Sequence, residues 1–209
     1  MLIPYLPVYS VFILPILLKN PCKNNICIFF RTFYSHAYLN LTIELDSNWT
    51  FSTADELQDM PEQLWDMVDG SQLADYMQTV PQVIDVQAID ATDNASFNIV
   101  FVKPSQAEAD YLATLTDEEL VQEMLRQEDL LISTYAQAGI EIVELSPKKI
   151  TFLGEERTAL LSSCRIAEND YYMIQIQNYR SGGYGSTLTV SAFSESRLEE
   201  LLSLFKPVE

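Results

Sequence analysis

The second half of the chain is a succession of strand-forming segments separated only by short connections. The connections are polar or rich in glycine, and short turns join antiparallel neighbours. In the last segment Leu188 and Val190 alternate with Thr187 and Thr189, the period of a strand with one apolar and one wetter face. The predicted strands are Ile140–Leu145, Lys149–Phe152, Arg157–Ile166, Tyr171–Tyr179 and Thr187–Phe193. This pattern predicts an antiparallel meander.

Two earlier pairs of segments have the same character. Leu39–Leu45 and Trp49–Ser52 are separated by turn-forming residues, and so are Val83–Ile89 and Phe97–Val102. Each pair predicts a hairpin. In the strand 97–102, apolar side chains point to both sides, so we expect both faces of the sheet to be covered.

Two capping boxes mark helix starts, because a threonine hydroxyl and a glutamate three residues later satisfy free amides there. They begin at Thr53 and Thr116. After Thr116, apolar residues recur at helical spacing until Gly139. The predicted helices are 54–80, broken around Pro61 and Gly70, then 117–138, and a terminal helix from Ser194 that Pro207 ends. The order of helices and strands predicts an α+β fold and excludes a doubly wound α/β fold.

Charge is distributed unevenly along the chain. The net charge is −18 over 209 residues, and all 30 acidic residues lie at or after Glu44. An acidic surface repels phosphate backbones, so nucleic acid is excluded as a partner. The 48% of apolar residues suffices for the core of one domain.

The first 37 residues differ in composition from the rest. Met1–Leu18 is almost entirely apolar, but prolines interrupt it and the cations Lys19 and Lys23 follow it. Three interpretations remain open: an atypical export signal or membrane anchor, an extension from a start site placed too far upstream, or a part of the fold. We therefore divide the chain into residues 1–37 and a single domain of residues 38–209. Any membrane contact is expected only through the first segment.

Several short motifs of the domain resemble those of small exported lipoproteins of Gram-positive bacteria, a family of unknown function. These motifs are Tyr38, Leu45, Asp46, Trp49, Phe51, Asp55-Glu56-Leu57, Ala138-Gly139-Ile140 and Ile150–Ala159. The resemblance implies the PsbP-like fold, which photosystem accessory proteins and a Ran-binding nuclear import factor share. The implied architecture is a three-layer α/β/α arrangement with a mostly antiparallel sheet. The resemblance also implies that the protein is exported from the cytoplasm or attached to the cell envelope.

No combination of residues in the domain predicts a catalytic, cofactor or metal site. The only histidine, His36, lies in the first segment. Cys164 is predicted to be a buried, inert thiol. The acidic residues between Asp55 and Asp69 lack the glycine-centred loop of calcium sites, and the glycine-rich loop 181–186 reads as a hairpin turn. A candidate binding patch is the tyrosine group Tyr171, Tyr172, Tyr179 and Tyr184.

These observations favour a non-enzymatic module that binds a protein or an envelope component, and we expect a monomer without cofactors. The alternative is a carboxylate-dependent hydrolase of the cell envelope, because acidic residues are abundant. Adjacent acids such as Glu155 and Glu156 make a poor catalytic pair, since neighbours on a strand point apart. A third interpretation, an accessory protein of assembly, rests on the resemblance alone.

Overall fold

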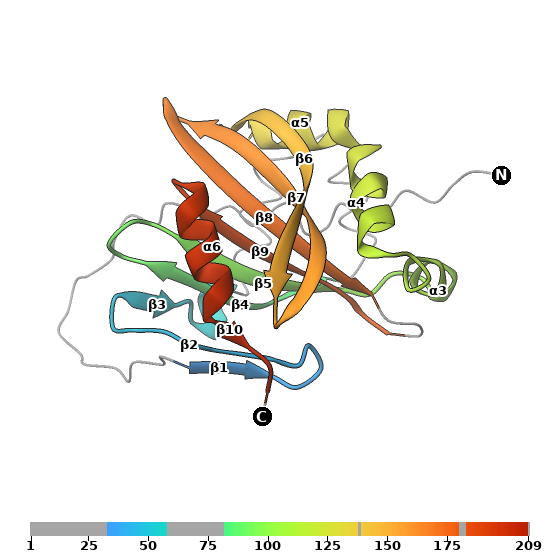
Figure 1. Ribbon diagram of the computed structural model, residues 1–209, viewed down its shortest axis with the longest axis horizontal. Coiled ribbons are helices and arrows are strands. Elements are labelled where there is room, and N and C mark those ends of the chain that lie inside the picture. Colours follow the sequence, from blue (N-terminus) through green and yellow to red (C-terminus); the bar gives the residue numbers. More distant parts are fainter. Residues whose placement is uncertain (1–32, 58–81, 138, 180–182, 209) are drawn as a thin grey trace.

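A computed structural model describes residues 33–57, 82–137, 139–179 and 183–208, and its centre is a curved, seven-stranded sheet (Figure 1). All neighbouring strands are antiparallel. In sheet order they are β3 (Trp49–Phe51), β4 (Gln82–Asp90), β5 (Ser96–Val102), β9 (Gly185–Ala192), β8 (Asn169–Tyr179), β7 (Glu155–Ile166) and β6 (Glu141–Phe152). The predicted meander and the hairpin of β4 and β5 are confirmed.

A small second sheet joins the two ends of the described chain. Its order is β1 (Phe33–His36), β2 (Leu41–Glu44) and β10 (Phe205–Lys206). The predicted hairpin of 39–45 with 49–52 is therefore wrong, because β2 pairs with β1 and β10 while β3 pairs with β4. The turn at Asp46, which accepts a hydrogen bond from the Asn48 amide (2.8 Å), passes the chain from one sheet to the other.

Strand β1 lies within the first 37 residues, so the described fold begins before the boundary expected at residue 38. The capping box at Thr53 is confirmed, since the Glu56 carboxylate accepts hydrogen bonds from the Thr53 amide (2.7 Å) and hydroxyl (3.0 Å). Residues 54–57 are helical, and the rest of the helix predicted to residue 80 lies outside the described residues.

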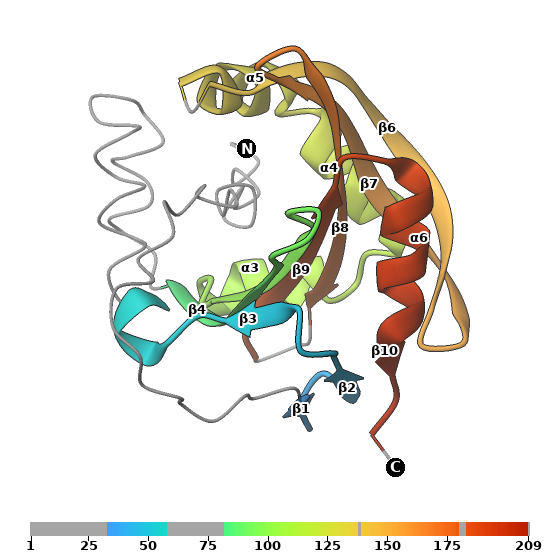
Figure 2. The ribbon, with the colours of Figure 1, turned by 90° about the vertical axis from the view of Figure 1, so that its left-hand side faces the viewer.

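Three helices lie on one side of the large sheet: α3 (Gln106–Leu112), α4 (Asp117–Leu125) and α5 (Glu128–Gln137). The single helix predicted over 117–138 is wrong, because the chain breaks at Arg126 and Gln127. A straight helix of that length would run roughly 30 Å in one direction, whereas α4 packs against β6 and β7 and α5 turns to follow β6 (Figure 2). The capping box at Thr116 is confirmed.

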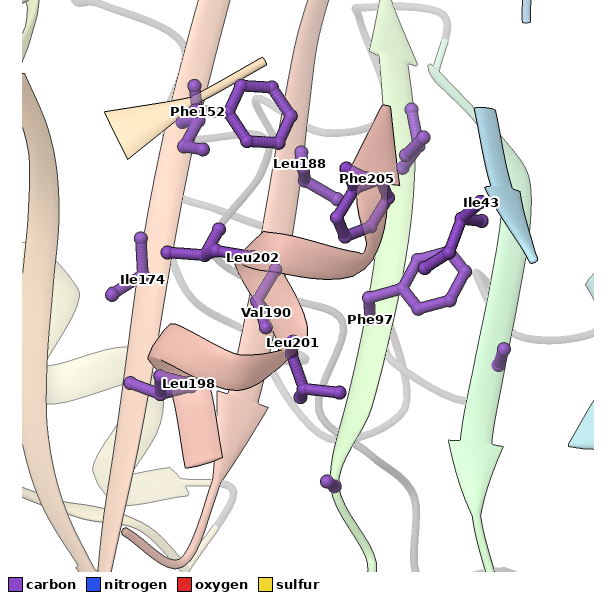
Figure 3. Close-up of a cluster of buried hydrophobic side chains, with 14 of the residues drawn as sticks. Ile43, Phe97, Phe152, Ile174, Leu188, Val190, Leu198, Leu201, Leu202 and Phe205 are labelled. Carbon is purple, nitrogen blue, oxygen red and sulfur yellow. The ribbon is translucent and has the colours of Figure 1, made fainter. Parts of the chain in front are cut away.

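Helix α6 (Glu195–Leu204) covers the opposite face of the sheet together with the small sheet. Leu198, Leu201 and Leu202 are buried against β5, β8 and β9, as Figure 3 shows around Phe97, Ile174 and Val190. The helix was predicted to run to Pro207, but it ends at Leu204 because Phe205 enters β10 and packs against Phe97 with ring centroids 5.2 Å apart. Helices on both faces of an antiparallel sheet confirm the three-layer α+β class.

The outermost strand β6 runs unbroken through Pro147, so the two separate strands predicted there are wrong. The two-residue turn at Leu153 and Gly154, both with positive φ, is closed by the pair Phe152–Glu155. Alternating along the ladder from this pair, Pro147 faces the open edge, where no ladder hydrogen bond is lost. A bulge at Val143 also distorts this edge.

Strand β4 has its own bulge, at Asp85, where the register with β5 shifts between Ile84 and Val86. These two residues therefore point to opposite faces although they are two positions apart. The inserted residue is Asp85 itself, and its side chain is exposed on the side of the small sheet. This places a carboxylate beside β1.

Candidate binding surface

The four tyrosines of the predicted patch do not form one surface. Tyr171 is fully buried on the face covered by α4 and α5, and burial raises its pKa. Tyr172, its neighbour on β8, points to the opposite face, as adjacent strand residues must. Tyr179 is half-buried at the end of β8, and Tyr184 is 49% exposed. A patch that includes Tyr171 is therefore wrong.

Tyr184 belongs instead to a cluster that the sequence did not reveal. We call Tyr34, His36, Tyr38, Phe101 and Tyr184 the aromatic surface. The His36 ring stacks on Phe101 with centroids 5.0 Å apart and an angle of 28° between the ring planes. Tyr38 meets Phe101 edge-on at 6.0 Å, and its hydroxyl donates to the Tyr184 carbonyl (3.1 Å).

The alternation of β1 explains this arrangement. Tyr34 and His36 point to the same side of the strand, and Tyr38 follows two residues later, while Phe33 points away and is 57% exposed. The spacing Tyr-x-His-x-Tyr was the signal in the sequence. It was missed because these residues were assigned, apart from Tyr38, to the N-terminal segment.

Polar groups lie among the rings. The Tyr34 hydroxyl donates a hydrogen bond to the Asp85 carboxylate, and burial followed by this bond raises the pKa of Tyr34, which keeps the phenol protonated. His36 Nε2 lies 3.9 Å from Asp85 Oδ2. At the other end, Lys103 Nζ lies 5.8 Å from the centre of the Tyr184 ring. The aromatic surface therefore has an acidic and a basic group beside it.

The surroundings of His36 do not form a nucleophilic site. Its Nδ1 accepts a weak hydrogen bond from the Leu39 amide (3.4 Å), and its Nε2 faces Asp85. Nucleophilic catalysis requires a hydroxyl or thiol within hydrogen-bond reach of such a base. In the part of the chain that the structure describes, no such bond to His36 occurs.

A groove of about 510 Å³ lies between β6 and the end of α6. Three lysines line it, Lys148, Lys149 and Lys206. Lys148 Nζ lies 2.6 Å from Glu195 and 3.5 Å from Glu199, and the bond to Glu195 raises the pKa of Lys148. A second groove, of about 190 Å³, contains Glu155 and Arg157. Each groove has one carboxylate among its lining residues, so neither offers the pair that the hydrolase alternative requires.

The remaining reactive groups have structural surroundings. Cys164 is buried, and burial raises the pKa of its thiol to about 12, as an inert thiol requires. Within the described ranges, no three metal-binding side chains converge. Asp59, Glu62, Asp66 and Asp69 of the predicted acidic run lie outside these ranges. Of the helices described, none is long and apolar enough to cross a membrane.

Comparisons with known proteins give likenesses to solved structures. No family model matches the chain, and no curated protein matches it. The chain is similar to the solution structure of cyanobacterial PsbP (CyanoP) from Synechocystis sp. PCC 6803, with 12% sequence identity and a TM-score of 0.43. The likeness covers 90% of this chain and 100% of that one.

Proposed function

We propose that this domain is a non-enzymatic binding module and that the aromatic surface holds a protein partner. The observation that carries the proposal is a group of half-buried or exposed aromatic side chains, in which His36 and Tyr38 contact Phe101 of β5 and Tyr38 bonds to the carbonyl of Tyr184. Tyrosine is enriched among the residues that dominate binding energy at protein interfaces.

The rings are held in place before any partner arrives. His36 stacks on Phe101, and the hydroxyls of Tyr34 and Tyr38 are hydrogen-bonded to Asp85 and to the Tyr184 carbonyl. Side chains that are already ordered lose little conformational entropy on binding. The arrangement therefore favours recognition of a matching apolar surface.

The charge of the chain favours a particular class of partner. With a net charge of −18, the protein attracts basic proteins at long range and repels acidic ones. We propose a partner with an apolar centre and a rim of lysine and arginine. Its association rate should fall as salt is added.

A site-specific photo-crosslinker tests the surface directly. We would place it at position 184 of the full chain, and at position 111 as the control, because Tyr111 on α3 is 42% exposed, close to the value of Tyr184. The expected result is a single crosslinked product from position 184, which is lost when Tyr38→Ala is added. Equal products from both positions, or none from position 184, would contradict the proposal.

The affinity for the partner found in this way gives the second measurement. We expect Tyr184→Ala to weaken binding about tenfold or more, and Tyr111→Ala to leave it unchanged. Circular dichroism should show that both variants retain their strands. An unchanged affinity of Tyr184→Ala would move the interface away from the aromatic surface.

The proposal includes a location in the cell envelope or outside the cell. It is supported by the apolar composition of residues 1–18 and by the acidic remainder of the chain. Mass spectrometry of the mature N-terminus in the native host tests it. Removal of the apolar segment, or a lipid mass on it, is expected, whereas an intact, unmodified start in the cytoplasm would contradict this part.

A further inference from the structure

His36 lies among the rings of the aromatic surface, with a donor beside one ring nitrogen and an acceptor beside the other. Its Nδ1 accepts a hydrogen bond from the Leu39 amide (3.4 Å), so the proton of the neutral ring is on Nε2. Nε2 lies 3.9 Å from Asp85 Oδ2. The side chains of His36 and Asp85 are 23% and 34% exposed, so both exchange protons with water.

The bond to the Leu39 amide helps to hold the turn that follows β1. The same turn contains a hydrogen bond from the Asn40 amide to the Ala37 carbonyl (3.2 Å), and Asn40 has a positive φ of 53°. Tyr38 lies within this turn, and its hydroxyl donates to the Tyr184 carbonyl. The position of Tyr38 on the aromatic surface therefore depends on how the turn is held.

A second proton on the His36 ring changes this arrangement. Histidine is the side chain that ordinarily gains its proton between about pH 5 and pH 8. Both ring nitrogens are donors in the protonated form, so Nδ1–H then faces the Leu39 N–H and their hydrogen bond is lost. The positive ring is at the same time attracted by the Asp85 carboxylate. Protonation therefore draws the ring away from the turn.

The other groups around His36 keep their charge in this pH range. Among the described residues, Asp85 is the one carboxylate within 4.0 Å of a ring nitrogen of His36. The remaining neighbours are the rings of Tyr34, Tyr38 and Phe101. Carboxylates and phenols ordinarily titrate outside this range, and burial with the bond to Asp85 raises the pKa of Tyr34 further. Lys103 lies at the other end of the surface, beside Tyr184.

We infer that His36 is a pH-sensitive switch of the aromatic surface. The neutral ring keeps Tyr38 against Phe101 and against the Tyr184 carbonyl, and the protonated ring releases it. Partner binding should then weaken on acidification. This consequence rests on the proposed function, whereas the rearrangement of the surface does not.

NMR of the full chain between about pH 5 and pH 8 tests the switch without a partner. His36 is the only histidine, so its ring signals are assigned directly. We expect the Leu39 amide and the Tyr38 ring signals to shift with the same midpoint as the His36 ring, while the ring of Tyr111 on α3 does not follow it. A titration of His36 that leaves the Leu39 and Tyr38 signals unchanged would overturn the inference.

His36→Phe is the matched variant, because it keeps a ring on Phe101 and cannot gain a proton. The Leu39 and Tyr38 signals should not shift with pH in this variant, and shifts as large as those of the unmodified chain would overturn the inference.

The photo-crosslinker at position 184 then relates the switch to the partner. In the unmodified chain the yield should be about fivefold lower at about pH 5.5 than at about pH 7.5, the effect of one ordinary hydrogen bond. His36→Phe should give the same yield at both values, whatever its affinity. Equal yields in the unmodified chain would overturn the regulation of binding. Absence of product at both values would contradict the proposed function alone, since the NMR titration decides the switch independently.

Discussion

The two faces of the large sheet bury different kinds of side chain. The face beneath α6 and the small sheet is a continuous apolar cluster that includes Phe97, Ile174, Val190 and Phe205. The opposite face combines an apolar cluster with buried amides such as those of Gln87, Gln175 and Gln177. Burial alone therefore does not distinguish the two faces, whereas the chemistry of the buried side chains does.

This difference indicates where the fold obtains its stability. Apolar area removed from water stabilises a domain in proportion to its extent, while buried amides and hydroxyls contribute little net stability even when they are paired. We therefore expect the α6 face to supply most of the stability. The opposite face, with its buried amides and hydroxyls, is expected to contribute less.

The largest effect is expected from truncation on the apolar face. Phe205→Ala removes a buried ring that contacts Phe97 and Phe152, and should lower the free energy of unfolding by about 3–5 kcal/mol. Urea denaturation measures it. Phe33→Ala is the control, since Phe33 is exposed, and should change stability by less than about 0.5 kcal/mol.

On the other face, Gln177→Leu should lower the free energy of unfolding by less than about 1 kcal/mol. A loss equal to that of Phe205→Ala would contradict the comparison of the two faces.

An intermediate effect is expected from the ion pair that anchors the helix on each face. Arg197 of α6 bonds to Asp90, whose side chain is 3% exposed, and Arg157 of β7 bonds to Asp117 of α4, which is 26% exposed. Arg197→Met leaves a buried carboxylate that Thr92 still partly satisfies, so we expect a loss of about 2–3 kcal/mol.

The matched variant Arg157→Met leaves a carboxylate that water can reach, so a smaller loss of about 1 kcal/mol is expected. Thermal unfolding of both variants, corrected to one temperature, gives the difference. If Arg157→Met proved the more costly variant, the α4 side would be the better anchored of the two.

The smallest effect concerns the cap of α4 and its dependence on pH. Hydrogen bonds from the Thr116 amide and hydroxyl lower the pKa of Glu119 below its ordinary value of 4.5. The ionised carboxylate therefore stabilises the folded chain above that value, and this contribution is lost as the pH falls through the lowered pKa.

The midpoint temperature of thermal unfolding, measured as a function of pH, tests the direction of this effect. Glu119→Gln should lower the midpoint slightly at pH 7, and the difference from the unmodified chain should disappear once the pH is below the lowered pKa of Glu119. Glu144→Gln, at an exposed position of β6, serves as the control for removing a surface carboxylate. A difference that grows on acidification would contradict the assignment.

Much of the fold was predictable because local signals were strong. Turn residues and alternation predicted the β4–β5 hairpin and the meander, and the capping boxes predicted two helix starts. Helix α3 was missed although Ser105 and Glu108 have the spacing of a capping box, and the Ser105 hydroxyl accepts a hydrogen bond from the Glu108 amide. The pairing of β2 with β10 was not predictable, because it joins segments at opposite ends of the chain.

The sites were less predictable than the fold. Alternation along the last strand predicted that Thr187 and Thr189 face a wetter side, yet both are 3% exposed. Alternation of apolar and polar residues shows which side chains share a face of a strand. It does not show which other elements cover that face. The aromatic surface was hidden for a related reason, since Phe101 meets His36 and Tyr38 only when β1 joins the small sheet.

The outer edge of β6 is poorly suited to pairing with a strand of another molecule. A row of free amides and carbonyls at a sheet margin invites another strand to dock, and ordered stacks grow in this way. Pro147, Lys148, Lys149 and the bulge at Val143 obstruct such docking here. Growth of ordered stacks through this edge is therefore disfavoured, even at high protein concentration.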